Sequence, residues 1–213
     1  MGGKLQLAIF DARAGWLALK ILARELGWRR ALAVGSAIQK AQARGEPFRE
    51  LDPPESAGEE LTRRQARGAI LLVRELASHV SPERARDIAG RIVKEASVLF
   101  LRQQIPAIDK RQILQMSEQE RMGFLQRLTR RFPNAVAQDI EIQGDEAFSF
   151  KIKRCLFVDL CEKIGEPEMA GLFCAGDLVF FDREQPQVIL TRPSTLSEGG
   201  DCCDFRFRWR DQK

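Results

Sequence analysis

Residues 199–209, GGDCCDFRFRW, decide how the C-terminal part of this chain folds. After the two glycines, charged and aromatic residues alternate, which is the period of a β-strand. On that period Cys203 and the three aromatic residues after it point to one face, while Cys202, Asp204 and the arginines point to the other. We therefore expect a strand whose aromatic face packs on a core and whose first buried residue is Cys203.

Upstream segments show the same period. Residues 135–143 and 148–155 alternate on either side of the turn GDEA, which is typical of an antiparallel hairpin. The rest of this half is predicted as a short helix over 156–165, a turn of helix within EMAGLFCAGD (168–177), and strands at 178–181 and 187–193.

The N-terminal half has the 3.6-residue period of amphipathic helices. Residues 5–44 are predicted as helix with a break at Gly27, and 45–58, with three prolines, as a connector. Further helices are expected over 59–79, over 82–103 after the N-cap Ser81, and from the capping box of Ser117 and Glu120. The prediction is an α+β protein in which a helical layer, residues 1–133, packs in one compact domain on a mainly antiparallel unit, residues 134–213.

Charge is divided unevenly between these halves. Residues 1–133 carry 24 Lys and Arg against 15 Asp and Glu, whereas residues 134–213 carry 10 against 15. The basic residues are spaced between acids along helices, which favours solvated helix faces over a nucleic-acid partner. No run approaches the ~20 apolar residues of a membrane span, and no signal-peptide pattern is present. We expect a cytoplasmic protein without a membrane partner, and leave a homodimer open.

All five cysteines lie between residues 155 and 203. Their odd number and the absence of a secretory signal favour free thiols. Cys161 falls on the apolar stripe of its helix and is expected to be buried. Cys155, Cys174 and Cys203 are placed at the ends of predicted elements, where functional groups tend to be displayed, so we expect their sulfurs to gather at one site.

The residue types leave three explanations open for these sulfurs. They could be buried structural thiols, or one could be a nucleophile if Arg154 or Arg192 lowers its pKa, with Asp177 or Asp204 moving protons. Alternatively, three thiolates could hold Zn²⁺, although no CxxC pair is present. The lone histidine, His79, lies near a predicted helix C-terminus, where a favourable contact with the helix dipole accounts for it.

The C-terminal third resembles the L-2-amino-thiazoline-4-carboxylic acid hydrolase family. The resemblance rests on KRCLFVDLCEKIGEPEMAGLFCAGDLVFF and ILTRPSTLSEGGDCCDFRFRW. The positions that match the family pattern are Arg154, Cys155, Gly165, Pro167, Glu168, Cys174, Asp177, Arg192, Thr195, Cys203, Asp204 and Phe205. It implies addition of water to the C=N carbon of a small cyclic amidine, whose ring opens toward a carbamoyl-cysteine.

This chemistry needs an activated water or thiolate, a proton donor for the leaving nitrogen, and a cation for the substrate carboxylate. On the resemblance we expect catalytic roles for Cys155, Cys174, Cys203 and Asp177, and substrate contacts from Arg154, Arg192, Thr195 and Asp204.

A second resemblance offers a different class of function. Gly-x-x-Cys-x-Phe after a strand is similar to ligand-binding domains of the 4-vinyl reductase type. That resemblance implies a sensor or carrier whose cysteines bind a small molecule or a metal without turnover, in a pocket between a helical layer and a sheet.

Overall fold

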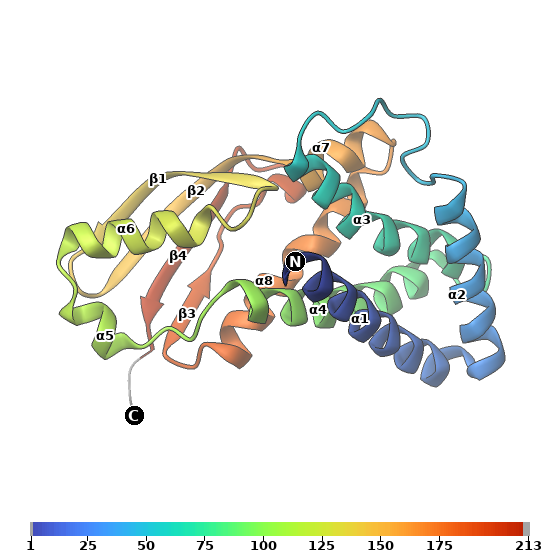
Figure 1. The fold of residues 1–213 in the computed structure, drawn as a ribbon, viewed down its shortest axis with the longest axis horizontal. Helices are drawn as coiled ribbons and strands as arrows, with labels where there is room; N and C mark the ends of the chain where they lie inside the picture. Colours follow the sequence, from blue (N-terminus) through green and yellow to red (C-terminus); the bar gives the residue numbers. More distant parts are fainter. Residues whose placement is uncertain (1, 211–213) are drawn as a thin grey trace.

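The computed structural model describes residues 2–210, with side chains from residue 9 onward, and shows a helical part beside a four-stranded sheet (Figure 1). The N-terminal helices are α1 (Gly2–Leu26), α2 (Trp28–Ala43), α3 (Ala57–Leu76), α4 (Pro82–Gln104), α5 (Lys110–Gln115) and α6 (Glu118–Thr129). The remainder comprises β1 (Ala135–Gln143), β2 (Ala147–Cys155), α7 (Leu156–Lys163), the 3₁₀ turn η1 (Pro167–Met169), α8 (Ala170–Glu184), β3 (Val188–Thr191), the 3₁₀ turn η2 (Leu196–Glu198) and β4 (Cys203–Trp209). The α+β prediction is confirmed.

The sheet is antiparallel throughout, with strand order β1-β2-β4-β3. In the central pair, Phe148 lies opposite Phe207, Phe150 opposite Phe205, and Ile152 opposite Cys203. The two phenylalanine pairs stack with ring centroids 4.4 and 4.9 Å apart. The predicted aromatic face therefore forms, and its last cross-strand pair brings Cys203 to one end of the sheet.

Helix α8 covers this aromatic face, and its extent corrects one prediction. Residues 178–181, LVFF, are helical rather than a strand, and Phe180 and Phe181 are buried against Phe207. A short apolar run fits a buried helix as well as a buried strand, so periodicity could not separate them. As a consequence Cys174 lies inside α8 and not at the end of an element.

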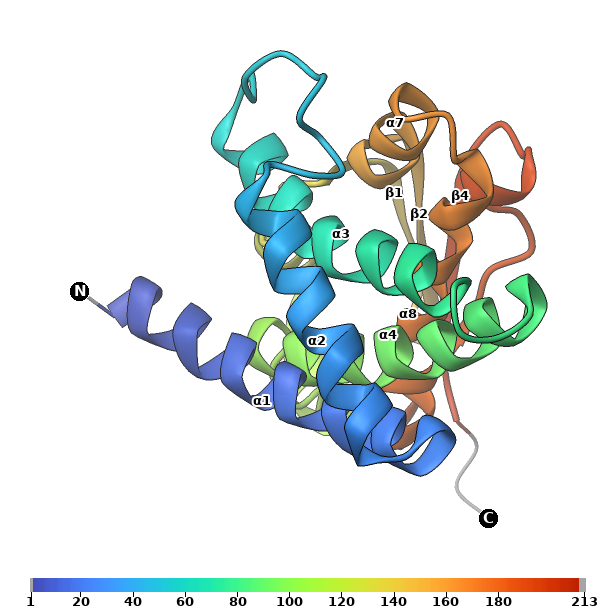
Figure 2. The ribbon, with the colours of Figure 1, turned by 90° about the vertical axis from the view of Figure 1, so that its right-hand side faces the viewer.

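Helix α4 joins the helical part to the sheet. Its first half supplies Ile88 and Ile92 to the core shared with α1–α3, while Val98 and Leu101 belong to the core between α8 and the sheet. Figure 2 shows α4 beside α8. The two helices approach so closely that a Cβ on Gly176 would lie 2.2 Å from Cβ of Ser97. Only glycine fits there, which fixes the position of α8.

Local signals predicted most helix boundaries. Ser81 caps α4, and Ser117 and Glu120 form the capping box of α6. Helix α5, capped by Asp109, was not predicted, because six residues carry too short a periodic pattern. Among the described helices, none combines the length and the apolar character needed to cross a bilayer.

Candidate functional site

Cys174 and Cys203 each contact the η2 turn, which lies at the end of the sheet where β2 finishes and β4 begins. The N–H of Leu196 in η2 donates to Sγ of Cys203 over 3.3 Å, and the hydroxyl of Ser197 donates to Sγ of Cys174 over 3.5 Å. Cys155 is the last residue of β2, and a charge on Cys203 would raise its pKa. The η2 turn thus links Cys174 to Cys203, with Cys155 within electrostatic reach.

A nearly buried ion pair adjoins these sulfurs. Nη1 of Arg192 donates to Oδ2 of Asp177 over 2.8 Å, and Nη2 donates to the carbonyl of Cys174 over 2.8 Å. The Arg192 side chain is 5% exposed, whereas that of Asp177 is 29% exposed. Cζ of Arg192 lies 5.3 Å from the centre of the Phe205 ring. Nε of Arg192 is buried without a hydrogen-bond partner. Nε is thus the one nitrogen of this guanidinium without an acceptor within the protein.

Burial controls the protonation of the thiols. It raises the pKa of Cys174 to about 11, and it also raises the pKa of Cys155 and of Cys203. The charge of Arg192 lowers the pKa of Cys174 and Cys203 but is outweighed by burial. The Cys174 thiol also donates to the carbonyl of Ala170 over 3.7 Å. These thiols are therefore neutral near pH 7, and the expected activation by an arginine does not produce a resting thiolate.

Asp177, unlike the thiols, is charged near pH 7 although burial raises its pKa too. Burial raises its pKa to about 6, against the opposing effect of the charge of Arg192 and the hydrogen bond from it. A carboxyl with a pKa near 6 is mostly ionised at pH 7 and yet readily takes up a proton. Of the predicted catalytic residues, Asp177 is the one whose titration suits proton transfer.

Thr195 shapes the turn that carries Leu196 and Ser197. Its buried hydroxyl donates to Oε2 of Glu198 over 2.5 Å and lies 3.2 Å from the hydroxyl of Ser197. Its carbonyl accepts from the N–H of Gly200, where a Cβ would lie 2.1 Å from Oγ of Ser194. Thr195 is thus placed to hold the turn, while Ser197 provides the contact to Cys174.

Two predicted substrate-binding residues lie outside the cluster. The Arg154 side chain is 78% exposed and pairs with Asp159. Asp204 pairs with Arg206 and lies on the face of the sheet opposite Cys203, as strand alternation requires. Cys161 is fully buried in a hydrophobic core, as predicted, and burial raises its pKa to about 12. His79 faces Glu75 at 3.2 Å, in the turn after α3.

The described residues do not form the set of ligands that a zinc site would require. Within the part of the chain that the structure describes, no three His, Cys, Asp or Glu side chains are placed as a group able to hold a metal ion. Cys174 and Cys203 instead accept hydrogen bonds from Ser197 and Leu196. The residues present do not fit a tetrahedral thiolate site.

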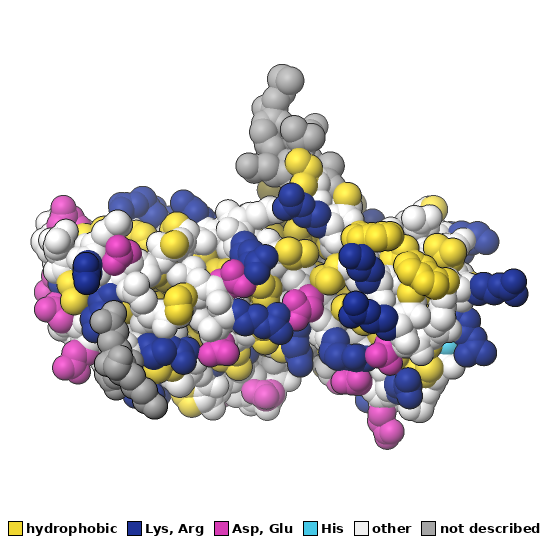
Figure 3. All heavy atoms as spheres, turned by 90° about the horizontal axis from the view of Figure 1, so that it is seen from below, with side chains coloured by type: hydrophobic (Ala, Val, Ile, Leu, Met, Phe, Trp, Pro, Cys, Tyr) yellow, Lys and Arg dark blue, Asp and Glu magenta, His cyan; other side chains and the backbone are white. Residues whose placement is uncertain are grey.

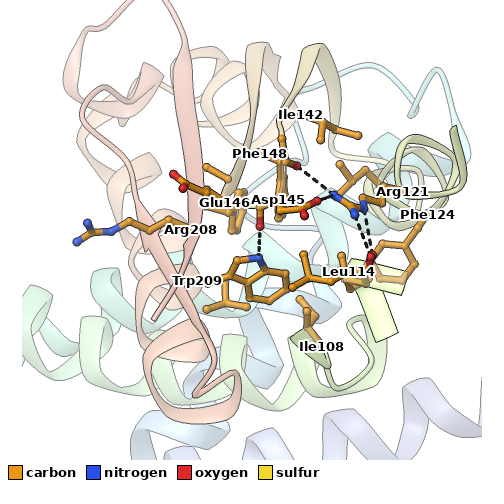
Figure 4. A pocket seen from close by; sticks show the side chains of 16 residues that line it. Ile108, Leu114, Arg121, Phe124, Ile142, Asp145, Glu146, Phe148, Arg208 and Trp209 are labelled. Carbon is orange, nitrogen blue, oxygen red and sulfur yellow. Dashed lines mark hydrogen bonds and ion pairs between the residues drawn. The ribbon is translucent and has the colours of Figure 1, made fainter. Parts of the chain in front are cut away.

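Two hollows of the structure lie elsewhere. A small apolar hollow of about 40 Å³ sits at the opposite end of the sheet, between α5, α6 and the strands, with Trp209 and Arg121 at its rim (Figure 4). A wider hollow of about 500 Å³ lies on the sheet face that carries Asp204, Lys151 and Arg208. Neither is lined by a cysteine, so the site at the sulfurs is not one of these hollows.

Residues that the sequence did not single out complete the cluster. Ser197 and Leu196 contact two sulfurs, and the side chain of Asn134 helps to hold down the pKa of Cys155. Asn134 precedes β1 and is 21 positions from Cys155, so no spacing rule connects the two. The only available signal was the Gly199-Gly200 pair, which predicted a turn without showing what the turn contacts.

A comparison with known protein families matches a range of the chain that contains this cluster. The profile of the family described as L-2-amino-thiazoline-4-carboxylic acid hydrolase matches residues 61–207, more than half of the chain. The match begins in α3 and ends in β4, so it includes all five cysteines, Asp177 and Arg192 but neither α1 nor α2. No curated protein and no solved structure matches the chain. The extent of the profile match establishes that the chain belongs to the L-2-amino-thiazoline-4-carboxylic acid hydrolase family.

Proposed function

We propose that this hydrolase-family protein opens a small cyclic amidine by adding water to its C=N carbon, with Asp177 as the general base. The observation that carries the proposal is the pair of Asp177 with Arg192. It joins a carboxyl whose pKa is about 6 to a guanidinium whose buried Nε has no partner. The partial exposure of Asp177 gives a small molecule access to this carboxyl.

The proton balance follows from these two groups. Asp177 accepts a proton from water as the oxygen bonds to the amidine carbon, and passes it to the ring nitrogen. The remaining hydroxyl proton then moves through Asp177 to the same nitrogen, the C–N bond breaks, and the carbon is left as a carbonyl beside a free amine. Arg192 orients the carboxylate, and its free Nε donates to a substrate carboxylate or to negative charge that develops during the reaction. No net oxidation or reduction occurs, and no further reactant is needed.

In this proposal the cysteines line the site as neutral groups. Their raised pKa values oppose a thiolate nucleophile, whereas weak S–H donors beside a carboxyl can exclude water and orient a sulfur-containing ring. A serine is nearly isosteric with a cysteine. We therefore expect Cys203→Ser to lower the turnover rate no more than about tenfold, because no covalent step is lost.

The decisive experiment compares Asp177→Asn with Asp182→Asn, using 2-amino-thiazoline-4-carboxylate as the substrate. Both residues lie on α8, but Asp182 is 74% exposed and pairs with Arg210 away from the cluster. Asp177→Asn should lower kcat about 1,000-fold, as expected for loss of a general base, while Asp182→Asn should leave it unchanged. Equal activity in the two variants would refute the role of Asp177.

A non-catalytic binding domain is the second candidate, and the neutral thiols favour it. Four cysteines have a raised pKa, which suits a site that holds a ligand without reacting with it. Isothermal titration with the same amidine separates the two functions. Binding without release of a ring-opened product would support the sensor, whereas turnover that depends on Asp177 supports the hydrolase.

A further inference from the structure

The helical hairpin of α1 and α2 presents an unusual surface. Among the described side chains, six large hydrophobic residues are exposed, and four of them lie on this hairpin: Ile9, Trp16, Trp28 and Leu32. Both tryptophans are 55% exposed and Leu32 is 58% exposed. Exposed apolar side chains that gather on one part of a surface are typical of an interaction site.

The exposed face of α1 also carries basic residues, which lie between the apolar ones along the helix. Ile9, Arg13, Trp16, Lys20 and Arg24 follow one another at spacings of three or four, so they share one side of the helix. The ammonium of Lys20 lies 5.1 Å from the centre of the Trp16 ring. Trp28 begins the next helix directly after this stripe ends. The α1 stripe therefore combines apolar and cationic side chains on one side of the helix, and α2 begins with a further exposed tryptophan.

The acids of the hairpin do not neutralise this edge. Residues 9–44 contain seven Lys and Arg but only Asp11 and Glu25 as acids. Asp11 pairs with Arg64 of α3, and Glu25 pairs with Arg84 and Arg91 of α4. Six cations have no ion-pair partner among the described side chains: Arg13, Lys20, Arg24, Arg29, Arg30 and Lys40. The acids thus hold the hairpin to the body, and the outward charge is positive.

We infer that α1 and α2 form a docking surface for an anionic phospholipid bilayer. Tryptophan and branched aliphatic side chains enter the boundary between headgroups and acyl chains, while lysine and arginine attract acidic headgroups. The expectation of no membrane partner rests on the lack of a membrane-crossing segment, and a helix that lies flat on a bilayer needs no such segment. A second copy fits worse, because an isologous contact would set one cationic edge against another.

The figures agree with this placement. In Figure 2, α1 projects beyond the body of the molecule. Figure 3, which views the molecule from below, shows hydrophobic side chains gathered beside Lys and Arg over the helical end. The surface lies outside the part of the chain that matches the hydrolase family, so it is independent of the proposed reaction.

The fluorescence of the chain's own tryptophans tests the inference. The sequence contains three, and Trp209 lies at the far end of the sheet, so Trp209→Phe leaves only Trp16 and Trp28 as reporters. Vesicles of phosphatidylcholine with about 30% phosphatidylglycerol are compared with vesicles of phosphatidylcholine alone. We expect at least a tenfold larger bound fraction on the anionic vesicles, a blue shift of the emission, and loss of binding at high salt.

Matched variants decide whether the hairpin is responsible. Arg13→Gln/Lys20→Gln/Arg24→Gln should reduce binding about tenfold or more, as should Trp16→Gln/Trp28→Gln measured by sedimentation with vesicles. Arg111→Gln/Arg127→Gln/Arg130→Gln removes the same charge from exposed positions on α5 and α6 and should leave binding unchanged. All these side chains are exposed, so circular dichroism should show an intact fold.

Three results would overturn the inference. The first is equal binding to the two kinds of vesicle, and the second is equal loss of binding in the control variant. The third is that single-stranded DNA, or a second copy of the chain in a stable dimer, binds to the same residues and prevents binding to vesicles. Vesicle binding that decreases when the cations of the hairpin are removed, and when the anionic lipid is omitted, supports the inference. This result does not depend on the catalytic activity of the protein.

Discussion

Two arginines at opposite ends of the same sheet are buried to a similar degree but differ in their hydrogen bonds. Arg121 donates to the carbonyls of Ile113, Leu114, Met116 and Gly144, and pairs with Asp145. Arg192 has one carboxylate and one carbonyl partner, and its Nε is left without any. Every nitrogen of Arg121 has at least one acceptor within the protein, whereas Nε of Arg192 has none, and the proposed function uses this donor to bind substrate.

The surroundings of the two arginines reinforce this contrast. Around Arg121 the turn after β1, helix α5 and the start of α6 are tied together, and the indole of Trp209 donates to the carbonyl of Asp145 over 2.8 Å (Figure 4). Around Arg192 the neighbours are thiols and a carboxyl with shifted pKa values. We therefore expect the first end to contribute to stability and, under the proposed function, the second to contribute to activity.

Replacing Arg192 should produce the largest effect on activity. Arg192→Met removes the donor to substrate and the group that orients Asp177, and it also raises the pKa of that carboxyl further. We expect kcat/KM to fall about 1,000-fold, equivalent to about 4 kcal/mol. Steady-state kinetics on the amidine, beside a thermal melt, provides the measurement. Activity retained in this variant would remove the distinction between the two arginines.

Replacing Arg121 should affect stability instead. Arg121→Met leaves four carbonyls without this donor, so we expect the free energy of unfolding to fall by about 3 kcal/mol. Urea denaturation followed by circular dichroism measures the loss. The kcat/KM of the folded fraction should be unchanged, and a loss of activity per folded molecule would contradict the assignment.

Crowding α8 against α4 tests how much the close contact between the two helices contributes to stability, measured as the free energy of unfolding in urea. Gly176→Ala places a methyl 2.2 Å from Cβ of Ser97 and should destabilise the protein by about 2 kcal/mol. Gly171→Ala on the same helix is the control, since nothing lies within 4 Å of a Cβ there. Adding Ser97→Gly should restore most of the stability, and no recovery would show that the clash is not the cause.

The pH dependence gives the smallest but most specific effect. Because the pKa of Asp177 is about 6, the base is lost as pH falls through that value. We expect kcat/KM to decrease about tenfold per pH unit below pH 6, and to stay level from pH 7 to 8. A rise in activity continuing toward pH 11 would instead indicate a thiolate of Cys174.

Much of the fold could be predicted, because local signals and packing agreed. The alternation in β4 matched the cross-strand pairs, and Ser81 and Ser117 capped the helices they were expected to cap. The strand predicted at 178–181 was wrong, since a run of four apolar residues does not show whether its backbone bonds lie within a helix or across a sheet. That choice depended on the packing of α8 against α4.

The pattern of charges also shows what a local sequence pattern cannot predict. Basic residues spaced between acids predict solvated helix faces, and along α4 acids and bases are indeed interspersed. In α1 and α2 the few acids pair with arginines of α3 and α4, which leaves the other cations of the hairpin without an acidic partner among the described side chains. Sequence spacing records how many charges a segment has, but not which of them are paired across the fold.

For the site, the sequence by itself determined the residue types: three cysteines, Asp177 and Arg192 on elements of recognisable period. Only the tertiary structure decided that Arg154 and Asp204 lie apart from the cluster, that Ser197 and Leu196 contact sulfurs, and that the thiols are neutral. Periodicity reports local backbone geometry, whereas burial and hydrogen-bond partners arise from segments distant along the chain. Those long-range contacts set the pKa values, and with them the chemistry that the residues can perform.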